Sequence, residues 1–165
     1  MAHFKSELPT ELMDQLKSME DNTDAMMAGM TRAGAEVVAS NARVNAPDAI
    51  KPYVKISKSY KTPSNGGINT QVYVSGYIPF SDPKRKYFAR RNGHSAKIYK
   101  TTLGVPAEFL ANIYEYGRNG YPFPKHPFLR KSFKKNQIEK AMNEAQEKFI
   151  KDPEQCARNW GKLFR

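Results

Sequence analysis

A long amphipathic periodicity near the N-terminus constrains the fold of this 165-residue chain more than any other feature. Ten positions recur at alternating steps of four and three residues, and eight of them are apolar, which is the spacing of one helix face. Thr10 is placed to cap such a helix and Pro47 to end it. The sequence therefore predicts a helix over 10–46, or two shorter helices if it breaks at 21–24. The ten positions are Leu12, Leu16, Met19, Thr23, Met26, Met30, Ala33, Val37, Ser40 and Val44.

The apolar face of this helix has two interpretations. The favoured one is a core stripe that packs against a sheet. The other is that part of the face contacts a second subunit, because methionines such as Met26 and Met30 adapt to irregular partners. Gly29 and Gly34 would permit a close approach of either partner.

Two alternating runs follow, over 53–60 and 68–75, and they predict β-strands. The Pro-Ser-Asn-Gly-Gly turn between them joins the two strands in a hairpin over 52–76. A stretch rich in lysine and arginine comes next, and we expect it to be a long basic loop over 81–104.

The C-terminal half predicts two further elements. Residues 106–117 predict a short helix followed by a strand, with Glu115 already in extended chain. Pro127 suits the first turn of a helix over 127–151. We expect the inner face of that helix to hold Phe128, Leu129, Phe133, Ile138, Ala141, Met142, Ala145 and Phe149.

Together these elements predict an α+β fold in a single domain over 1–165. The long N-terminal helix and the C-terminal helix are expected to pack on a small antiparallel β-sheet, with the long basic loop beside it. The length suits one domain, and the aromatic and aliphatic residues supply one core.

Charge is divided unevenly along the chain. The net charge is +11, yet residues 1–50 carry four Lys and Arg against eight acids, a net of −4. Residues 51–165 carry 23 against eight, a net of +15. This division predicts a particle that meets something anionic, or a copy of itself, on one side.

The composition also indicates the cellular compartment in which the protein is made. A single cysteine excludes an internal disulfide and a cysteine-based zinc site. No run is apolar enough for a signal peptide or a membrane helix. We therefore expect a soluble protein made in a reducing cytosol, with no membrane contact.

No arrangement of residues predicts catalysis, a metal site or a cofactor site. His3, His94 and His126 show no metal-ligand spacing, and no glycine-rich phosphate loop is present. Cys156 has no histidine near it in sequence, which favours an inert, partly buried thiol. Glu108 is seven residues from Glu115, but an acid/base pair would need a pocket. The sequence therefore predicts a protein that is not an enzyme and carries no cofactor.

The basic arm, Lys84–Lys100, carries seven positive charges and no acid. Tyr87, Phe88 and Tyr99 are interleaved with these charges, a composition typical of phosphate and base contacts. Three interpretations stay open: a solvated loop, contact with an acidic protein surface, or direct contact with nucleic acid. No recognised nucleic-acid-binding motif accompanies the arm.

The C-terminal half also carries a recognisable phrase. It runs Ile113–Gly117 (Ile-Tyr-Glu-Tyr-Gly), then Pro122, then Pro127–Arg130 (Pro-Phe-Leu-Arg) at the start of a helix. With the long helix that ends in Ala42–Pro47, this phrase resembles the tail-completion (head–tail joining, or neck) proteins of tailed bacteriophages. The resemblance spans residues 10–150 in order and spacing. It departs from the family after Pro47, where a Gly-x-Leu step is missing, and in a long segment over 82–103, whose contacts cannot be carried over.

The resemblance implies a structural virion protein, made in the bacterial host cytoplasm, that forms a ring between head and tail. A homo-oligomeric ring of six or twelve subunits would bind the head connector or portal side on one face and tail terminator or tail tube proteins on the other. Non-specific contact with passing DNA is also expected. The candidate interface residues are Arg85, Lys86, Arg90, Arg91, Tyr116, Gly117, Phe128 and Arg130.

Two other functions remain open at this point. One is a tail-terminator type of protein at the end of the tail tube, which shares the ring but lies one layer further from the head. The other is a small cytosolic nucleic-acid-binding protein that uses the arm Lys84–Lys100.

Overall fold

The computed structural model describes residues 10–64, 66–80, 87–89, 99–101, 104–117 and 125–163. The chain forms two compact units, each built from separate segments. Unit 1 consists of Met1–Val37, Lys58–Gln71 and Lys135–Arg165, and unit 2 of Val38–Ser57 and Val72–Lys134. Helices and short antiparallel strand pairs make up the described residues, so the predicted α+β class is confirmed. The single domain over 1–165 stays a prediction.

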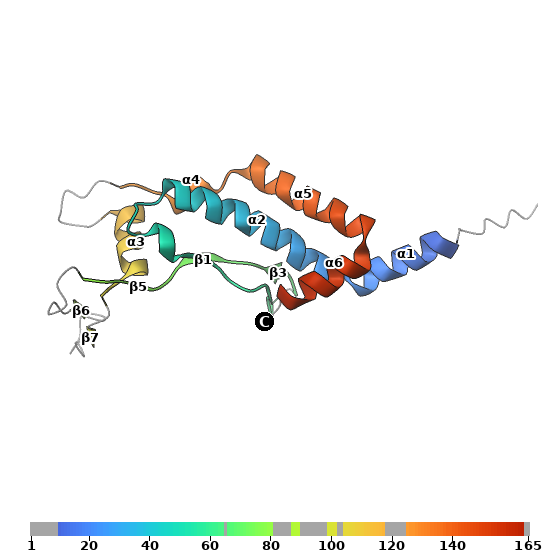
Figure 1. Ribbon diagram of the computed structural model, residues 1–165, viewed down its shortest axis with the longest axis horizontal. Coiled ribbons are helices and arrows are strands. Elements are labelled where there is room, and N and C mark those ends of the chain that lie inside the picture. The colour runs from blue at the N-terminus through green and yellow to red at the C-terminus, as the bar shows by residue number, and fades with distance from the viewer. Residues whose placement is uncertain are drawn as a thin grey trace, which may run out of the picture. The chain divides into compact units, whose positions relative to one another are not determined.

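The N-terminal periodicity forms two consecutive helices (Figure 1). Helix α1 covers Thr10–Asp21 and helix α2 covers Thr23–Asn45, with a one-residue interruption at Asn22. The interruption lies inside the stretch 21–24, where a break was considered. Helix α2 belongs to unit 1 as far as Val37 and to unit 2 beyond it.

Close helix packing builds unit 1. Gly34 on α2 faces Ile138 of α5, and a Cβ atom on Gly34 would lie 3.2 Å from the Ile138 side chain. Gly29 is covered by the indole of Trp160, which stacks on Phe149 with ring centroids 5.9 Å apart. Figure 1 shows α5 running beside α2. The C-terminal elements of this unit are α5 (Lys135–Lys151), α6 (Pro153–Trp160) and the 3-10 helix η2 (Gly161–Leu163).

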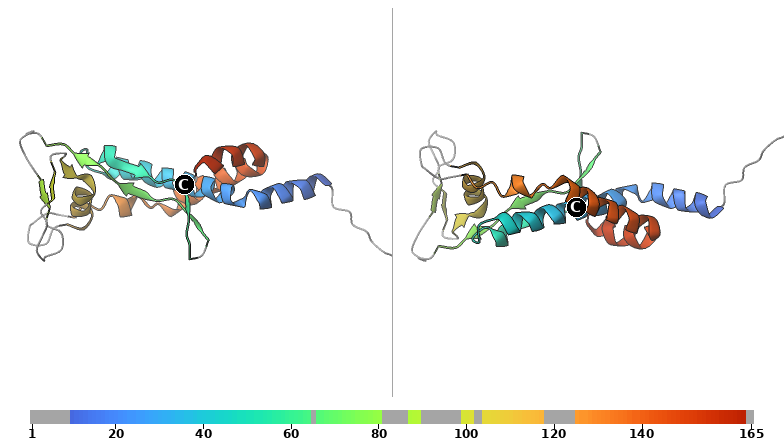
Figure 2. Two further views of the ribbon diagram at one scale, coloured as in Figure 1. Left: turned by 90° about the horizontal axis from the view of Figure 1, so that it is seen from below. Right: turned by 90° about the horizontal axis from the view of Figure 1, so that it is seen from above.

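A hairpin completes unit 1. Strand β2 (Tyr60–Lys61) pairs antiparallel with β3 (Ile68–Asn69), and both views of Figure 2 show this hairpin extending away from the helices of the unit. Its base is held by hydroxyl groups: Thr70 lies 3.0 Å from the hydroxyls of both Thr31 and Ser59. Ser59 is fully buried, and its backbone N–H donates to the carbonyl oxygen of Leu163 at 2.9 Å.

Among the described residues of unit 2, three antiparallel strand pairs are present. The predicted hairpin over 52–76 continues here, with Val54 opposite Val74 and Ile56 opposite Val72. A further pair lies within the expected basic loop over 81–104, so part of that loop is strand. The pairs are β1 (Val54–Ile56) with β4 (Val72–Val74), β5 (Tyr77–Ile78) with β8 (Val105–Pro106), and β6 (Tyr87–Ala89) with β7 (Tyr99–Thr101).

The core of unit 2 joins the end of α2, strand residues and helix α3 (Ala107–Tyr116). Alanines on α2 and α3 allow close backbone approach, and Phe128 is the largest fully buried side chain of this core. Arg43 ties α2 to β1, because its Nη2 donates to the carbonyl oxygen of Val54 at 2.9 Å. The buried residues of this core are Ala39, Ala42, Ala46, Ile50, Val54, Val74, Ala107, Ala111 and Phe128.

The predicted helix over 127–151 is interrupted. Helix α4 covers only Leu129–Ser132, and α5 begins at Lys135. Between them the backbone of Phe133 has ψ = 80°, which leaves the helical region and turns the side chain outward. Phe133 is 65% exposed, so its prediction as an inner-face residue was wrong. Phe128, Ala145 and Phe149 are buried as predicted.

Candidate functional site

A buried carboxylate organises one end of unit 2. Glu115 lies in the last turn of α3 and is only 2% exposed. Its Oε2 accepts the backbone N–H groups of Phe128 at 2.9 Å and Leu129 at 3.1 Å. Its Oε1 accepts the backbone N–H of Arg130 at 3.1 Å and the Arg130 Nε at 2.9 Å. One side chain thus joins α3 to the start of α4, in what we call the Glu115 junction (Glu115, Phe128, Leu129 and Arg130).

Arg130 closes this junction from the solvent side. Besides its bond to the carboxylate, its Nη2 donates to the backbone carbonyl oxygen of Glu115 at 2.9 Å. The guanidinium also lies over the ring of Tyr116, 5.0 Å from the ring centroid. Both Arg130 and Tyr116 are exposed, so their outer faces form a small surface patch beside the junction.

The sequence explains why the junction forms here. Gly117 has φ = 80°, a conformation that favours glycine, and its N–H donates to the carbonyl oxygen of Ile113. Gly117 thereby ends α3 directly after Glu115 and Tyr116. At the start of α4, Phe128 provides no side-chain cap, so the first N–H groups need another acceptor. The carboxylate of Glu115 supplies it, and its negative charge also favours a helix N-terminus.

Further hydrogen bonds fix the part of the chain around the start of α4. Ser132 is fully buried, and its hydroxyl donates to the carbonyl oxygen of Phe128. The side chain of Asn41 on α2 donates to the carbonyl oxygen of Ser132 at 3.3 Å. The backbone N–H of His126 donates to the carbonyl oxygen of Tyr114 at 2.8 Å. Segments that are far apart in sequence are therefore fixed to one another by directed polar contacts.

Two opposing effects act on the pKa of Glu115. Burial on its own would raise that pKa, since it disfavours the charged form. Hydrogen bonds from the Arg130 side chain, and from the backbone of Arg130, Leu129 and Phe128, outweigh burial and hold the pKa below its ordinary value. The carboxylate is therefore charged at neutral pH, and each of its oxygens accepts two hydrogen bonds. This arrangement fixes geometry rather than moving protons.

The role of Glu115 was not predicted from the sequence. Glu115 was predicted to lie in extended chain, whereas it belongs to α3, so this prediction was wrong. The signal that could have found it is the glycine that follows Tyr116, because glycine commonly ends a helix. An acid in the last turn of a helix opposes the helix dipole, which points to a separate use for that acid.

The predicted interface residues fall into three groups. Arg85, Lys86, Arg90 and Arg91 lie outside the residues that the structure describes. Phe128 is buried in the core of unit 2. Tyr116, Gly117 and Arg130 lie together at the Glu115 junction. Their part in an interface stays a prediction.

The remaining candidates for chemistry lie apart from the junction. Glu108 is exposed on α3 and makes no acid/base pair with the buried Glu115. His126 is exposed, while His3 and His94 lie outside the described residues. Cys156 is half-buried, and burial, together with nearby Asp152, raises the pKa of its thiol. A raised pKa leaves the thiol protonated and unreactive.

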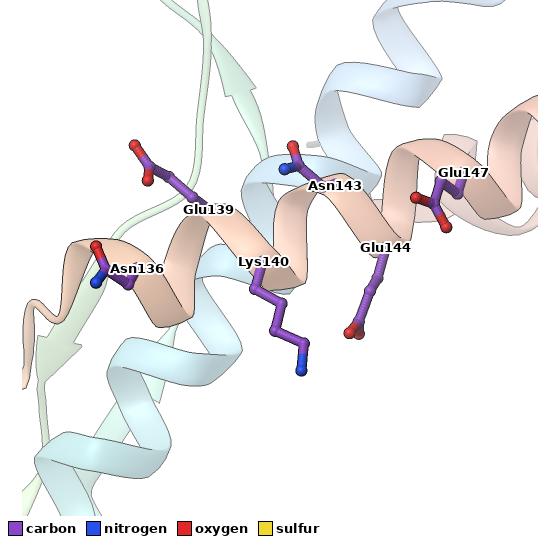
Figure 3. Close-up of a pocket in the computed structure, with 6 residues that line it drawn as sticks. All are labelled: Asn136, Glu139, Lys140, Asn143, Glu144 and Glu147. Carbon is purple, nitrogen blue, oxygen red and sulfur yellow. The ribbon is translucent and has the colours of Figure 1, made fainter.

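A shallow hollow lies on one side of α5. Figure 3 shows that its labelled side chains all come from this helix and fan out from it rather than converge on a common point. Such a surface offers no enclosed space for a substrate. The lining residues are Asn136, Glu139, Lys140, Asn143, Glu144 and Glu147.

No three His, Cys, Asp or Glu side chains among the described residues gather closely enough to hold a metal ion. Within the same residues, no helix combines the length and the apolar character that a membrane span requires.

Comparison with known proteins gives one match. Residues 10–117, which are well over half of the chain, match the model of the family described as "Bacteriophage HK97-gp10, putative tail-component". The match includes α1, α2, the strands and all of α3 up to Gly117. Neither the curated proteins nor the solved structures gave a significant match. The chain therefore belongs to the HK97 gp10-like family of phage tail components.

Proposed function

We propose that this protein is a structural component of a tailed-phage virion, where it forms a ring at the neck. The ring completes the tail and joins it to the head connector. The observation that carries this proposal is the family match over residues 10–117, which makes the chain a phage tail component. The ordered phrase that ends in Pro127–Arg130 supports the finer placement at the head–tail junction.

The Glu115 junction supports a structural role in particular. A ring subunit must hold its contact surfaces in a fixed arrangement while it binds neighbours on different sides. Four hydrogen bonds to one buried carboxylate fix the start of α4, including Arg130, whose guanidinium lies over the ring of Tyr116 at the surface. We propose no catalytic step, because this buried acid uses both of its oxygens to accept those bonds.

The proposed partners follow from the ring. Copies of the chain associate in a ring of six or twelve, with the head connector or portal side on one face and the tail terminator or tail tube on the other. We propose that Tyr116, Gly117 and Arg130 lie at one of these interfaces, and that the arm Lys84–Lys100 touches an acidic neighbour or the passing DNA. The mature protein would then be found in the virion, at the neck.

A phage that lacks this gene tests the proposal. We expect it to accumulate DNA-filled heads and separate tails, since the two would not join. The wild-type gene supplied from a plasmid should restore joined particles, and so should a Glu108→Ala variant, which changes an exposed acid of the same helix. A Glu115→Ala variant should restore few. Absence of the protein from purified virions would contradict the proposal.

The position of the protein within the particle separates the remaining candidates. Electron microscopy of labelled virions should place the protein against the connector. A position at the end of the tail tube, one layer further from the head, would instead indicate a tail terminator. A nucleic-acid-binding protein would be absent from the particle, and its affinity for DNA or RNA would fall with salt and in an Arg90→Ala, Arg91→Ala variant.

A further inference from the structure

Arg130 presents hydrogen-bond donors at the surface that the Glu115 junction does not use. Its Nε and Nη2 donate to Glu115, so one side of the guanidinium is occupied by the junction. Its Nη1 donates to no acceptor among the described residues, and 60% of the side chain is exposed. Both carboxylate oxygens of Glu115 already accept two hydrogen bonds each, so Nη1 needs an acceptor from outside the junction.

The guanidinium is held in one orientation before any partner binds. The two bonds to Glu115 fix its plane, and the ring of Tyr116 lies 5.0 Å away, with that residue 61% exposed. Arginine and tyrosine side chains that are fixed in this way lose little conformational entropy on binding, and they are the residue types that dominate many protein interfaces. We call Tyr116 and Arg130 together the Arg130 surface.

The chemistry of the Arg130 surface favours a carboxylate on a protein. A planar guanidinium matches the geometry of an oxyanion and binds it with charge-assisted hydrogen bonds. Lys131 and Lys134 are also exposed, and no acid occurs in the sequence between Tyr116 and Ile138. The exposed ring of Tyr116 adds apolar area, which the stems of long side chains cover better than a phosphate backbone does.

Carboxylates that lack a cation lie together on α5. Glu144 and Glu147 are both exposed, and their spacing of three residues makes them neighbours on one helix face. They line the shallow hollow of Figure 3, where Glu139 pairs with Lys135 at 3.6 Å. The side chains of Glu144 and Glu147 form no ion pair or hydrogen bond within the described part of the chain. Neighbouring like charges repel, so a cation between these two would be stabilising.

We propose that Arg130 of one copy of the chain binds between Glu144 and Glu147 of a second copy. This inference rests on the proposed ring, because a ring requires two different surfaces that complement each other from subunit to subunit. The Arg130 surface supplies donors without an acceptor, and α5 supplies acceptors without a cation. Each copy carries both surfaces, so the contact repeats from one subunit to the next.

Cysteine cross-linking of the full-length protein tests this contact. In a Cys156→Ser background, one preparation carries Lys131→Cys, next to Arg130, and a second, tagged preparation carries Asn143→Cys, in the hollow of α5. After mixing and mild oxidation, we expect a disulfide-linked species of one tagged and one untagged chain. The control replaces Asn143→Cys by Ser64→Cys, at an exposed turn of unit 1. The test pair should give about tenfold more product, because the contact raises the local concentration of the two thiols.

Charge reversal on α5 supplies an independent readout that leaves the Glu115 junction untouched. Glu144→Lys together with Glu147→Lys in the Asn143→Cys chain should lower the yield about tenfold. The matched control is Asp14→Lys together with Glu154→Lys, which reverses two exposed acids elsewhere in unit 1 and should change the yield less than about twofold. Unfolding curves of each variant establish that the fold is intact.

Three results would overturn the inference. The first is an equal yield from the test and control cysteine pairs, and the second is an equal loss from the two charge reversals. The third is a yield at the control level together with an affinity for DNA that falls with salt and in Arg130→Lys, which would assign the Arg130 surface to nucleic acid. Failure of the ring proposal has a different signature: the cross-link would form normally, while the protein would be missing from purified virions.

Discussion

Each unit of this protein is stabilised internally by a different kind of contact. In unit 2, one carboxylate accepts four hydrogen bonds and joins α3 to α4, so a single group carries much of the organisation. Unit 1 is stabilised by the stacked rings of Trp160 and Phe149 and by the close packing at Gly29 and Gly34. Polar contacts of the first kind need defined geometry, whereas apolar packing weakens by degrees. We infer from this difference that the polar junction of unit 2 positions surface residues, whereas close packing of α2 against α5 and α6 stabilises unit 1.

The largest expected effect comes from breaking the polar junction. Glu115→Ala would leave the N–H groups at the start of α4 without their acceptor and the Arg130 guanidinium without its carboxylate. Removing one partner of a buried charged network costs about 3–5 kcal/mol of unfolding free energy. Denaturant unfolding measures this loss. Glu108→Ala, at an exposed position of α3, is the matched control and should change stability by less than about 0.5 kcal/mol.

Hydrogen exchange would show where the loss of stability is felt. In Glu115→Ala, amide protection should fall most at Phe128, Leu129 and Arg130, whose N–H groups lose their acceptor. Uniform loss of protection in α5 and α6 as well would contradict the separate roles assigned to the two units.

A smaller effect is expected from overpacking unit 1. A Cβ atom on Gly29 would lie 2.2 Å from the Trp160 ring, so Gly29→Ala must displace the indole from its place on Phe149. Overpacking of this kind costs about 1–3 kcal/mol. Gly161→Ala is the control, because nothing lies within 4 Å of the added atom. Thermal unfolding should separate the two variants, and equal melting temperatures would contradict the packing described for α6.

The smallest effect is a dependence on pH that belongs to the junction alone. The pKa of Glu115 in the folded protein lies below its ordinary value of 4.5. The stabilisation it provides is therefore complete above that value and is lost as the pH falls through the folded pKa. The gap in unfolding free energy between wild type and Glu115→Gln should shrink as the pH is lowered below 4.5. A gap that widened in acid would refute the charged junction.

Much of the fold could be predicted from local pattern. The helical periodicity marked α1 and α2, and the turn residues marked the hairpin, because both signals depend on near neighbours in the sequence. The interruption at Phe133 could not be found in this way. Its residues continue a plausible helix face, whereas in the structure Phe128 lies in the core of unit 2, Ser132 is fully buried, and the backbone leaves the helix at Phe133.

The site was harder to predict than the fold. Tyr116, Gly117 and Arg130 were selected from a family phrase, but the residue that joins them, Glu115, was assigned to extended chain. Its partners are 13 to 15 residues away in sequence, and no local signal specifies such a contact. The glycine that ends α3 was the available clue, since it places Glu115 in the last turn of a helix.

The segment order of the two units has a consequence for synthesis of the chain. The segments of unit 2 end at Lys134, whereas unit 1 requires the segment that starts at Lys135. The packing of Trp160 on Gly29, and the hydrogen bond from Ser59 to Leu163, can therefore form only after the segment that starts at Lys135 has been synthesised. Since chains fold progressively as they emerge, the Glu115 junction can form while α1 still lacks α6. A nascent subunit would thus have its Glu115 junction in place before its own first helix is anchored.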